Sequence, residues 1–435
     1  MADSVKIGIV GLGTVGASVF KLLNSNSELI KNRVSRSVEV VAVSARDKNK
    51  DRGINTSKVK WYDDPLDMAD DKDIDIIVEL IGGHEGTAFE LIEKSLKNGK
   101  KVVTANKALI AMRAKELLSL LKETNGTIAY EAAIAGAIPI VGGVKHGLAA
   151  NNISAIYGIL NGTCNYILSE MSDTGRDFDD VLKEAQDKGY AEADPSFDVD
   201  GIDTAHKTSI LAGLAFGVVP DFTQGHRGDS VQIKGIRSIN ATDIKFADEL
   251  GYVIKLLGTA RKVEGGIEQS VEPCLVPKSS PVASVSGALN AVYVDGDFSG
   301  KILMTGAGAG GNETASAVVA DVIDIARGSS SSALLGVSEV AEFKAADIKD
   351  RKSSYFIRLS VIDKPGVIAD ISAILRDCSV SLESILQRGH NPNKQVSIIL
   401  TTHETSEGSV SKALELISEL DSVSETPNIM RIESF

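Results

Sequence analysis

The sequence predicts a multidomain protein of mixed α/β and α+β class. Its 435 residues exceed the roughly 100 to 200 residues of a typical single domain. Apolar, β-branched runs alternate with helical stretches over about residues 1–130, which is typical of a parallel sheet. Period-two segments between about 252 and 305 indicate antiparallel strands. A βαββαβ order follows Tyr355. We therefore expect three folded parts.

The N-terminal part is predicted to be a doubly wound, Rossmann-like domain. Its strands alternate with helices, so right-handed crossovers place them in one parallel sheet. A glycine-rich turn at Gly306 opens a further helix over residues 314–327, which we expect to dock on the same domain. The domain then spans residues 1–133 plus 306–328. The expected strands cover residues 5–10, 38–43, 74–80, 101–104 and 127–130.

Residues 134–305 are expected to form a second domain, with helices on one face of an antiparallel sheet. Its first strand-like run covers residues 153–160, and its most apolar helical pattern covers 202–217. Further helical stretches lie near residues 162–172 and 178–188. The change of pattern near residue 133 marks the boundary with the first domain.

A serine-rich and polar stretch at residues 329–353 indicates a linker. Residues 354–435 then have the order of a ferredoxin-like unit. Because a linker separates this unit, we expect a chain that ends near Gly328 to keep a working core. The expected elements of the unit are strands at 355–361, 380–386, 395–400 and 428–432 and helices at 367–377 and 409–420.

Composition favours a small-molecule ligand. Apolar residues make up 43% and charged residues 24%, which is typical of a globular protein. The net charge of −13 argues against nucleic acid or an anionic membrane as the main partner. The longest apolar run, residues 209–219, is well short of the ~18 residues of a membrane span. The N-terminus also lacks a secretory pattern, so we expect a cytoplasmic protein.

The three cysteines and six histidines give no metal-binding or disulfide pattern. Cys164, Cys274 and Cys378 are widely spaced and odd in number, as expected of reduced thiols. The histidines form neither an HExxH motif nor a short-spaced pair. A transition-metal centre is therefore not expected.

The segment GLGTVG predicts a dinucleotide-binding loop, because it stands between a strand-like run and a helical one. The first glycine permits a tight turn, the second admits a pyrophosphate close to the backbone, and the third lets helix pack on strand. The N–H groups of the helix N-terminus favour a bound phosphate. A glycine turn without ligand is the alternative. The expected cofactor contacts are Gly11, Leu12, Gly13, Thr14, Val15 and Gly16.

The end of the second strand favours NADPH over NADH. An NAD-specific site usually has Asp or Glu there, to bind the ribose hydroxyls. This chain has Ser44, Ala45 and Arg46, and an arginine after small residues suits a 2′-phosphate. Asp47 keeps NADH as an alternative, and a solvated surface arginine is the other interpretation of Arg46.

Two segments carry charged residues suited to catalysis. Lys107 follows a strand at the carboxyl edge of the sheet, where open α/β folds bind ligands, although a surface lysine also fits that position. Asp203 and Lys207 lie four residues apart on an apolar helix, so they share a face and can pair. The acidic loop before them contains Glu192 and Asp198. A lysine among acids beside a buried helix indicates a site for an amino-bearing substrate.

Together, these motifs resemble the homoserine dehydrogenase family. Other segments typical of that family are TANK ending at Lys107, EAAIAGAIP from Glu131, NGTCN from Asn161 and GAGAGGNETASAVVADV from Gly306. The final unit, with DKPGV from Asp363, resembles an ACT domain, a regulatory amino-acid-binding module. The resemblance covers essentially the whole chain. The family signature is matched without a gap by Ala185, Gly189, Asp194, Pro195, Asp198, Gly201, Asp203 and Lys207.

The resemblance implies reversible hydride transfer between NAD(P)H and aspartate 4-semialdehyde, giving L-homoserine for threonine, methionine and isoleucine synthesis. It implies that Lys207 is the acid/base and that Lys107 lies in the cofactor and carbonyl region. It assigns substrate binding to Glu192, Asp198 and Asp203, and Asp203 also orients the lysine. As hydride arrives, the carbonyl oxygen gains negative charge, which an ammonium within about 3 Å stabilises and then protonates.

Further contacts and partners follow from the same resemblance. Gly189 and Gly310 match backbone positions that touch the cofactor. The ACT domain implies an amino-acid effector such as threonine. ACT-like sheets commonly pair edge to edge, so we expect a homodimer or homotetramer. A loop that binds a monovalent, sodium-like cation through backbone carbonyls is matched by Glu131, Ile134, Gly136 and Ile138.

Two other functions fit parts of the sequence. An aldehyde-oxidising dehydrogenase would use a cysteine nucleophile, for which Cys164 is the candidate. Packing at the start of a helix is the simpler interpretation of that cysteine. A non-catalytic sensor of NADP and an amino acid would keep the glycine loop and the C-terminal unit. It would give no role to Lys207 among the acids.

Overall fold

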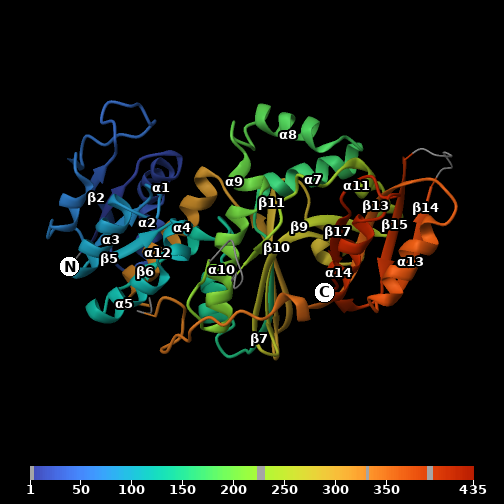
Figure 1. The fold of residues 1–435 in the computed structure, drawn as a ribbon. Helices are drawn as coiled ribbons and strands as arrows, with labels where there is room; N and C mark the ends of the chain where they lie inside the picture. Colours follow the sequence, from blue (N-terminus) through green and yellow to red (C-terminus); the bar gives the residue numbers. More distant parts are fainter. Residues whose placement is uncertain (1–3, 223–230, 330–332, 389–394) are drawn as a thin grey trace.

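Figure 1 shows an elongated molecule whose three parts follow one another in a row. The computed structural model describes residues 4–222, 231–329, 333–388 and 395–435. The N-terminal part lies at one end and the C-terminal unit at the other, with the long antiparallel strands between them. Within those residues, no helix is both long and apolar enough to span a bilayer.

The N-terminal sheet is parallel throughout, as predicted, and its strand order is β3-β2-β1-β4-β5-β6. Apolar clusters form on both of its faces, which is why its strands are nearly continuous apolar runs. The edge strand β3 was not predicted, because three residues carry no periodic signal. The elements are β1 (Val5–Val10), α1 (Thr14–Ser25), α2 (Ser27–Val34), β2 (Val38–Ser44), β3 (Lys60–Tyr62), β4 (Ile76–Glu79), α3 (Thr87–Lys97), β5 (Lys101–Thr104), α4 (Lys107–Met112), α5 (Ala114–Thr124) and β6 (Ile128–Ala129).

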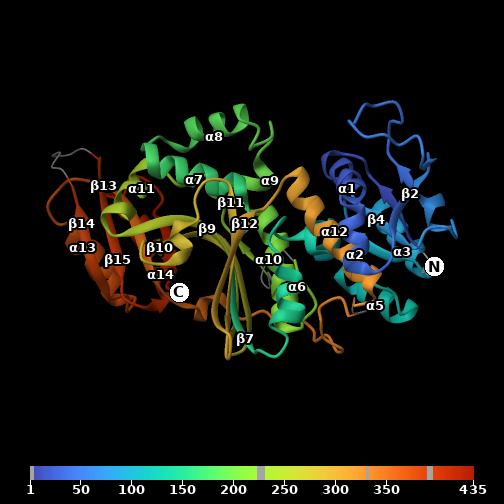
Figure 2. The same cartoon turned by 180° about the vertical axis from the view of Figure 1, so that it is seen from behind.

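Helix α12 (Gly311–Arg327) lies against α1 in the N-terminal part, although the middle domain precedes it in the sequence (Figure 2). Val318 and Val322 of α12 are buried in the same cluster as Val19 and Phe20 of α1. Apolar residues at helical spacing thus bring the segment after Gly310 back to the glycine loop.

The middle domain contains antiparallel strands with helices packed on them, as predicted. Helix α10 packs on β7, β9 and β10 and also contacts α4 of the N-terminal part. This helix is buried almost all round, because it lies between the two domains. The elements are α6 (Ile140–Gly142), β7 (Ile153–Ile159), α7 (Gly162–Thr174), α8 (Phe178–Asp187), α9 (Ser196–Val199), α10 (Ile202–Phe216), β8 (Gln232–Ile233), α11 (Ala241–Glu249), β9 (Tyr252–Val263), β10 (Gly266–Pro277), β11 (Leu289–Gly296) and β12 (Gly300–Ala307).

The C-terminal unit has the predicted βαββαβ order, with the short strand β16 added at its rim. Its antiparallel strands take the order β17-β13-β15-β14. Apolar side chains from both helices and from the strands form one core, which includes Ile371, Leu375 and Val410. The elements are β13 (Lys352–Ile362), α13 (Val367–Asp377), β14 (Leu382–Gln387), β15 (Gln395–Thr402), β16 (Thr405–Ser406), α14 (Glu407–Ser418) and β17 (Asn428–Ile432).

The middle domain and the C-terminal unit share one continuous sheet of 11 strands. Strand β17 pairs antiparallel with β13 and, on its other side, parallel with β10 through Cys274↔Arg431 and Leu275↔Ile432. We had expected two separate sheets. Sequence pattern identifies each strand but does not show which edges pair.

The described part of the expected linker is packed along the middle domain. Leu334 and Leu335 are buried in the central apolar core, and the Leu334 carbonyl accepts a hydrogen bond from the Tyr130 hydroxyl at 2.7 Å. Farther along, Val219 N–H donates to Ala341 O at 2.9 Å and Ile267 N–H donates to Lys344 O at 2.8 Å. The two leucines therefore anchor this stretch in the apolar core, which its mostly polar composition does not predict.

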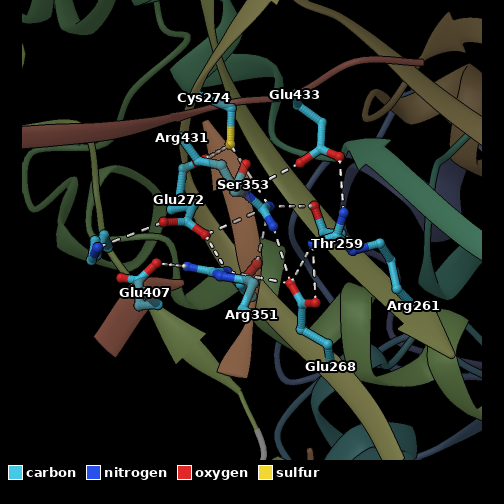
Figure 3. Close-up of polar contacts among 12 residues, drawn as sticks. Thr259, Arg261, Glu268, Glu272, Cys274, Arg351, Ser353, Glu407, Arg431 and Glu433 are labelled. Carbon is cyan, nitrogen blue, oxygen red and sulfur yellow. Dashed lines mark hydrogen bonds and ion pairs between the residues drawn. The ribbon is translucent and has the colours of Figure 1, made fainter. Parts of the chain in front are cut away.

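A buried Arg–Glu cluster lies where the shared sheet passes from β10 to β17 (Figure 3). The Arg431 side chain is fully buried, and its Nη1 lies 3.0 Å from Glu268 Oε1. Arg351 Nη1 lies 2.7 Å from Glu272 Oε1. Burial alone would raise the pKa of Glu272, but Arg431 and Arg351 lower it to about 2. The members of this cluster are Arg261, Glu268, Glu272, Arg351, Glu407, Arg431 and Glu433.

Candidate active site

The glycine loop joins β1 to α1 with the geometry of a phosphate-binding turn. Gly11 has a φ of 98°, which only glycine adopts readily. A Cβ on Gly16 would lie 1.9 Å from Gly11 O, so only glycine fits there. A Cβ on Gly13 would meet no atom within 4 Å, and Gly13 and Thr14 are exposed. Open space therefore lies beside the N-terminus of α1, where a pyrophosphate would bind.

Leu12 and Val15 support this loop from within, since Leu12 is buried and Val15 is half-buried against the same core. Gly310 is the N-cap residue of α12, in the turn that follows β12. A Cβ on its neighbour Gly311 would lie 2.9 Å from the Thr14 side chain. The N-termini of α1 and α12 therefore meet at one place. This geometry fits a cofactor contact at Gly310.

A cavity of about 340 Å³ adjoins the end of β2 and is lined by Ser44, Ala45 and Arg46. Its remaining wall includes Glu85 from the loop after β4. Arg52, which was not predicted to contribute, donates from Nε to Leu12 O at 3.0 Å. A basic residue in an irregular loop gives no sequence signal for such a contact. The residues around this cavity fit the adenosine half of a dinucleotide with a 2′-phosphate.

Lys107, Asp203 and Lys207 come together between the domains. Lys107 is the first residue of α4, which Asn106 caps by accepting from Leu109 N–H at 3.1 Å. Asp203 Oδ1 lies 2.6 Å from Lys107 Nζ, and Asp203 Oδ2 lies 2.8 Å from Lys207 Nζ. Both Asp203 and Lys207 are buried, whereas the Lys107 side chain is 34% exposed. One carboxylate thus holds two ammonium groups in one place.

Burial and neighbouring charges shift the pKa values of Asp203 and Lys207. It lowers the pKa of the Lys207 ammonium, and the nearby Lys107 charge lowers it further, while Asp203 opposes both effects. Burial alone would raise the pKa of Asp203, but Lys207 and Lys107 together hold it well below its usual range. A charged Asp203 beside a buried lysine of lowered pKa is suited to acid/base chemistry. Lys207 also donates to Leu160 O at 2.7 Å, which fixes its direction.

Asp198, expected in the acidic loop, lies on the short helix α9 and reaches this site, whereas Glu192 lies farther out. Asp198 Oδ1 accepts from Asn161 Nδ2 at 2.8 Å, and its Oδ2 accepts from Thr163 Oγ1 at 3.2 Å. Glu192 is exposed in the loop after α8, and its side chain has no ion pair among the described residues. Gly189 lies in the same turn with a φ of 76°. The structure therefore brings Asp198 to Asp203 through Asn161, but places no bond between Glu192 and either of them.

The loop expected to bind a cation packs closely against the end of β12. The Glu131 carboxylate accepts from Val141 N–H and Gly142 N–H, both at 2.8 Å. Gly136 has a φ of 53°, and a Cβ there would lie 2.6 Å from Gly308 O. Ile134 and Ile138 are buried. In this loop the Ile138 carbonyl accepts from Ile140 N–H at 2.8 Å, whereas among the described residues no loop backbone N–H bonds to Ile134 O or Gly136 O.

Cys164 does not have the environment of a nucleophile. Its thiol is fully buried, and burial raises its pKa well above the usual range. Sγ lies 3.3 Å from Asp198 O, and the Cys164 N–H is part of the cap of α7. The cysteine packs in the first turn of the helix, which favours the simpler of its two interpretations.

Comparison with known proteins identifies the family. The model of the homoserine dehydrogenase catalytic domain matches residues 139–323, and that of the homoserine dehydrogenase NAD-binding domain matches residues 11–131. A homoserine dehydrogenase of Pseudomonas aeruginosa is 43% identical, with 99% of each chain covered. The chain belongs to the homoserine dehydrogenase family. Its C-terminal unit matches the ACT domain over residues 355–422.

Two solved homoserine dehydrogenases extend this comparison. The enzyme of Thiobacillus denitrificans superposes with a TM-score of 0.92 at 42% identity, covering 99% of this chain and 98% of that one. A hyperthermophilic archaeal homoserine dehydrogenase in complex with NADPH has a TM-score of 0.61 at 28% identity, covering 74% of this chain and 97% of that one.

Homoserine dehydrogenases are NAD(P)-dependent oxidoreductases that interconvert aspartate 4-semialdehyde and L-homoserine, and this is the activity of the chain. The comparison thus confirms the reaction class that the sequence signature predicted. The ACT domain is consistent with feedback regulation by an amino acid. Membership of the family does not by itself assign a role to each residue of the site. Asn161 is the residue of this homoserine dehydrogenase site whose contacts the sequence did not reveal, although an Asn before a helical run is a recognisable cap signal.

Proposed function

We propose that Lys207 is the acid/base of this homoserine dehydrogenase and that Lys107 stabilises charge on the same substrate oxygen. The observation that carries the proposal is the double salt bridge of Asp203, at 2.6 Å to Lys107 and 2.8 Å to Lys207. Two ammonium groups held by one carboxylate present a concentrated positive field to a developing alkoxide.

The bound nicotinamide supplies the hydride, and the residues of the chain handle the charge that results. In aldehyde reduction, Lys207 and Lys107 stabilise negative charge on the carbonyl oxygen, and Lys207 transfers a proton to that oxygen. In homoserine oxidation, the neutral amine of Lys207 accepts the hydroxyl proton. The lowered pKa of the buried Lys207 makes this amine available closer to neutral pH than for a free lysine.

We propose that the carboxylates of Glu192 and Asp198 hold the ammonium group of the substrate, while Asp203 orients Lys207. Glu192 is exposed and has no described ion-pair partner, so its charge is available to a ligand. Asp198 is linked to Asp203 through one side-chain amide, so a substrate held by Asp198 lies near the lysines. Such fixed placement is a large part of catalysis by orientation.

NADP(H) is the proposed cofactor, with the backbone of Gly11–Gly16, Gly189 and Gly310 as contacts and Arg46 at the 2′-phosphate. Arg46 lines the cavity at the end of β2, where no acidic residue follows the strand directly. We expect Arg46→Ala to lower kcat/KM for NADP about 10- to 100-fold and to leave NAD within about threefold. Steady-state assays with both cofactors measure this; equal losses for both would contradict the preference.

The proposal includes a monovalent cation such as sodium, held by backbone carbonyls of Glu131, Ile134, Gly136 and Ile138. Hard oxygen donors suit such an ion. The Glu131 carboxylate is occupied by two backbone N–H groups, so its role is to shape the loop. Replacing sodium by a large organic cation in the assay buffer should then lower activity or thermal stability.

We also propose threonine as the effector of the ACT domain, a homodimer or homotetramer as the assembly, and the cytoplasm as the location. All three cysteines are free and buried, as suits a reducing compartment. Assays with and without L-threonine, and the mass in solution by light scattering, test the first two.

The test of the catalytic assignment compares Lys207→Ala and Lys107→Ala with the wild type. We expect Lys207→Ala to lower kcat for homoserine oxidation at least 1000-fold, with the NADPH Kd within about threefold, and Lys107→Ala to lower kcat at least 10-fold. Fluorescence titration of NADPH provides the binding control. Normal turnover of Lys207→Ala would overturn the assignment and favour the sensor interpretation.

A further inference from the structure

Asn161 stands at the junction of β7 and α7, next to the catalytic lysine and its carboxylate. Its residue is only 6% exposed. The preceding residue, Leu160, accepts the hydrogen bond of Lys207 Nζ at 2.7 Å through its carbonyl oxygen. Two consecutive residues of this junction therefore contact the Asp203–Lys207 pair, one through the backbone and one through a side chain.

The Asn161 side chain makes three hydrogen bonds, two toward the carboxylates of the site and one toward the helix. Its Nδ2 donates to Asp198 Oδ1 at 2.8 Å and to Asp203 Oδ2 at 2.9 Å. Its Oδ1 accepts from Cys164 N–H at 2.8 Å and so caps α7. Carboxylates need donors and a backbone N–H needs an acceptor, so this chemistry fixes which end of the amide faces which group.

We infer that Asn161 is a positioning residue for hydride transfer, which holds Asp198 and Asp203 in one fixed arrangement. The inference rests on the proposed roles of those carboxylates and of Lys207. Asp203 Oδ2 is shared between Asn161 Nδ2 and Lys207 Nζ, at 2.9 and 2.8 Å. One amide thus connects the carboxylate proposed for the substrate with the carboxylate that holds both lysines.

The shared oxygen also gives Asn161 an electrostatic effect on Lys207. Donation from Nδ2 satisfies part of the negative charge on Asp203 Oδ2. Without that donor, the carboxylate would attract the Lys207 ammonium more strongly and would favour its protonated form. A residue that only capped α7 would have no such effect on the pH dependence of turnover.

Two substitutions separate this role from capping. Asn161→Ser keeps a side-chain oxygen for the helix cap and removes the two amide N–H groups that reach both carboxylates, since the shorter serine hydroxyl has only one hydrogen to donate. Asn161→Asp keeps the shape and the cap acceptor, because Asp caps helices as well as Asn does, but turns a carboxylate toward two others. Asn240→Ser is the matched control: Asn240 Oδ1 caps α11 by accepting from Asp243 N–H at 3.0 Å, away from the lysines.

We expect kcat for homoserine oxidation to fall about 10- to 100-fold in Asn161→Ser and further in Asn161→Asp. The rising limb of the kcat–pH profile should move to higher pH in the same order, and the NADPH Kd should stay within about threefold. Asn240→Ser should lose thermal stability comparably and keep the wild-type profile. Because Asn161→Asp keeps both shape and cap, it provides the readout even if Asn161→Ser folds poorly.

The inference is overturned if both Asn161 variants keep the wild-type pH profile and lose activity only as Tm falls, as Asn240→Ser does. In that case Asn161 is a helix cap and nothing more. Failure of the proposed function gives a different result, since the wild-type enzyme would then not oxidise homoserine at all or Lys207→Ala would retain its turnover.

Discussion

Lys207 shows how a single side chain is prepared by its surroundings. Burial favours the neutral amine, whereas Asp203 at 2.8 Å favours the ammonium. Lys107 contacts the other oxygen of the same carboxylate. Its positive charge also favours the neutral amine of Lys207. The pKa of Lys207 therefore depends on burial and on two charged neighbours, Asp203 and Lys107, and each neighbour can be changed separately.

Asp203→Asn removes the group that favours protonation of Lys207. Burial and Lys107 are then opposed only by the weaker effect of Asp198, so the pKa of Lys207 falls further and the neutral amine is present at lower pH. For homoserine oxidation, which needs the neutral amine, the rising limb of the kcat–pH profile should move to lower pH. We expect the plateau to fall about 100-fold, because both lysines lose the charged carboxylate that holds them together. A limb that stays at the wild-type pH would contradict this account.

Glu272 makes a corresponding prediction for stability. Its pKa is lowered from 4.5 to about 2, so the stability that it contributes is present above pH 4.5 and is lost as the pH falls toward 2. Glu272→Gln should cost about 3 kcal/mol at pH 7, where a buried pair is broken. The difference from the wild type should shrink at pH 3, as measured by urea unfolding. Glu264→Gln, on the exposed hairpin of β9 and β10, is the control and should change little at either pH.

At the scale of elements, two glycines of the dinucleotide loop serve different ends: Gly16 is needed for folding, and Gly13 leaves room for the cofactor. A Cβ on Gly16 would lie 1.9 Å from Gly11 O, whereas a Cβ on Gly13 would meet nothing. Gly16→Ala should therefore lose about 2 kcal/mol or more of stability. Gly13→Ala should keep its Tm and bind NADPH at least 10-fold more weakly, because its methyl group occupies the space expected for the pyrophosphate. Thermal melts and NADPH titrations measure the pair; a Gly13→Ala variant with normal affinity would place the phosphates elsewhere.

The elements also show what sequence pattern can and cannot predict. The strands and helices with long apolar patterns, such as β1, α10 and α12, were predicted because burial imposes periodicity on them. The short edge strand β3 and the packing of Leu334 and Leu335 were not predicted, because they depend on contacts with distant residues. The spacing of Asp203 and Lys207 predicted their pairing. Their meeting with Lys107 and Asn161 required the packing of α10 on α4 and β7.

On the scale of the whole molecule, the ACT domain is built into the catalytic domain. Strand β17 belongs to both halves of the shared sheet, and its Arg431 satisfies the buried Glu268 of β10. Removing one partner of a buried ion pair costs about 3 to 5 kcal/mol. The segment with Leu334 and Leu335 fills part of the central core as well. The composition of the linker predicted that a chain ending near Gly328 keeps a working core. These contacts lead us to expect that it does not.

A chain that ends at Gly328 should therefore be unstable and lack homoserine oxidation, and so should a chain that ends at Glu425, which lacks only β17 and the last residues. Solubility, circular dichroism and turnover of both proteins check this. A shortened chain with wild-type Tm and turnover would mean that the shared sheet is not needed for catalysis. Retained turnover in the Gly328 protein alone would show that the ACT domain is only regulatory.

The shared strand β17 has a consequence for synthesis on the ribosome. Arg431 and Glu268 are 163 residues apart, so β10 leaves the ribosome well before its partner strand β17. The edge of β10 and its glutamates lack Arg431 until β17 has been synthesised. We expect the catalytic sheet to close only then, so that a message cut short before β17 yields incompletely folded chains that proteases remove rather than an active enzyme.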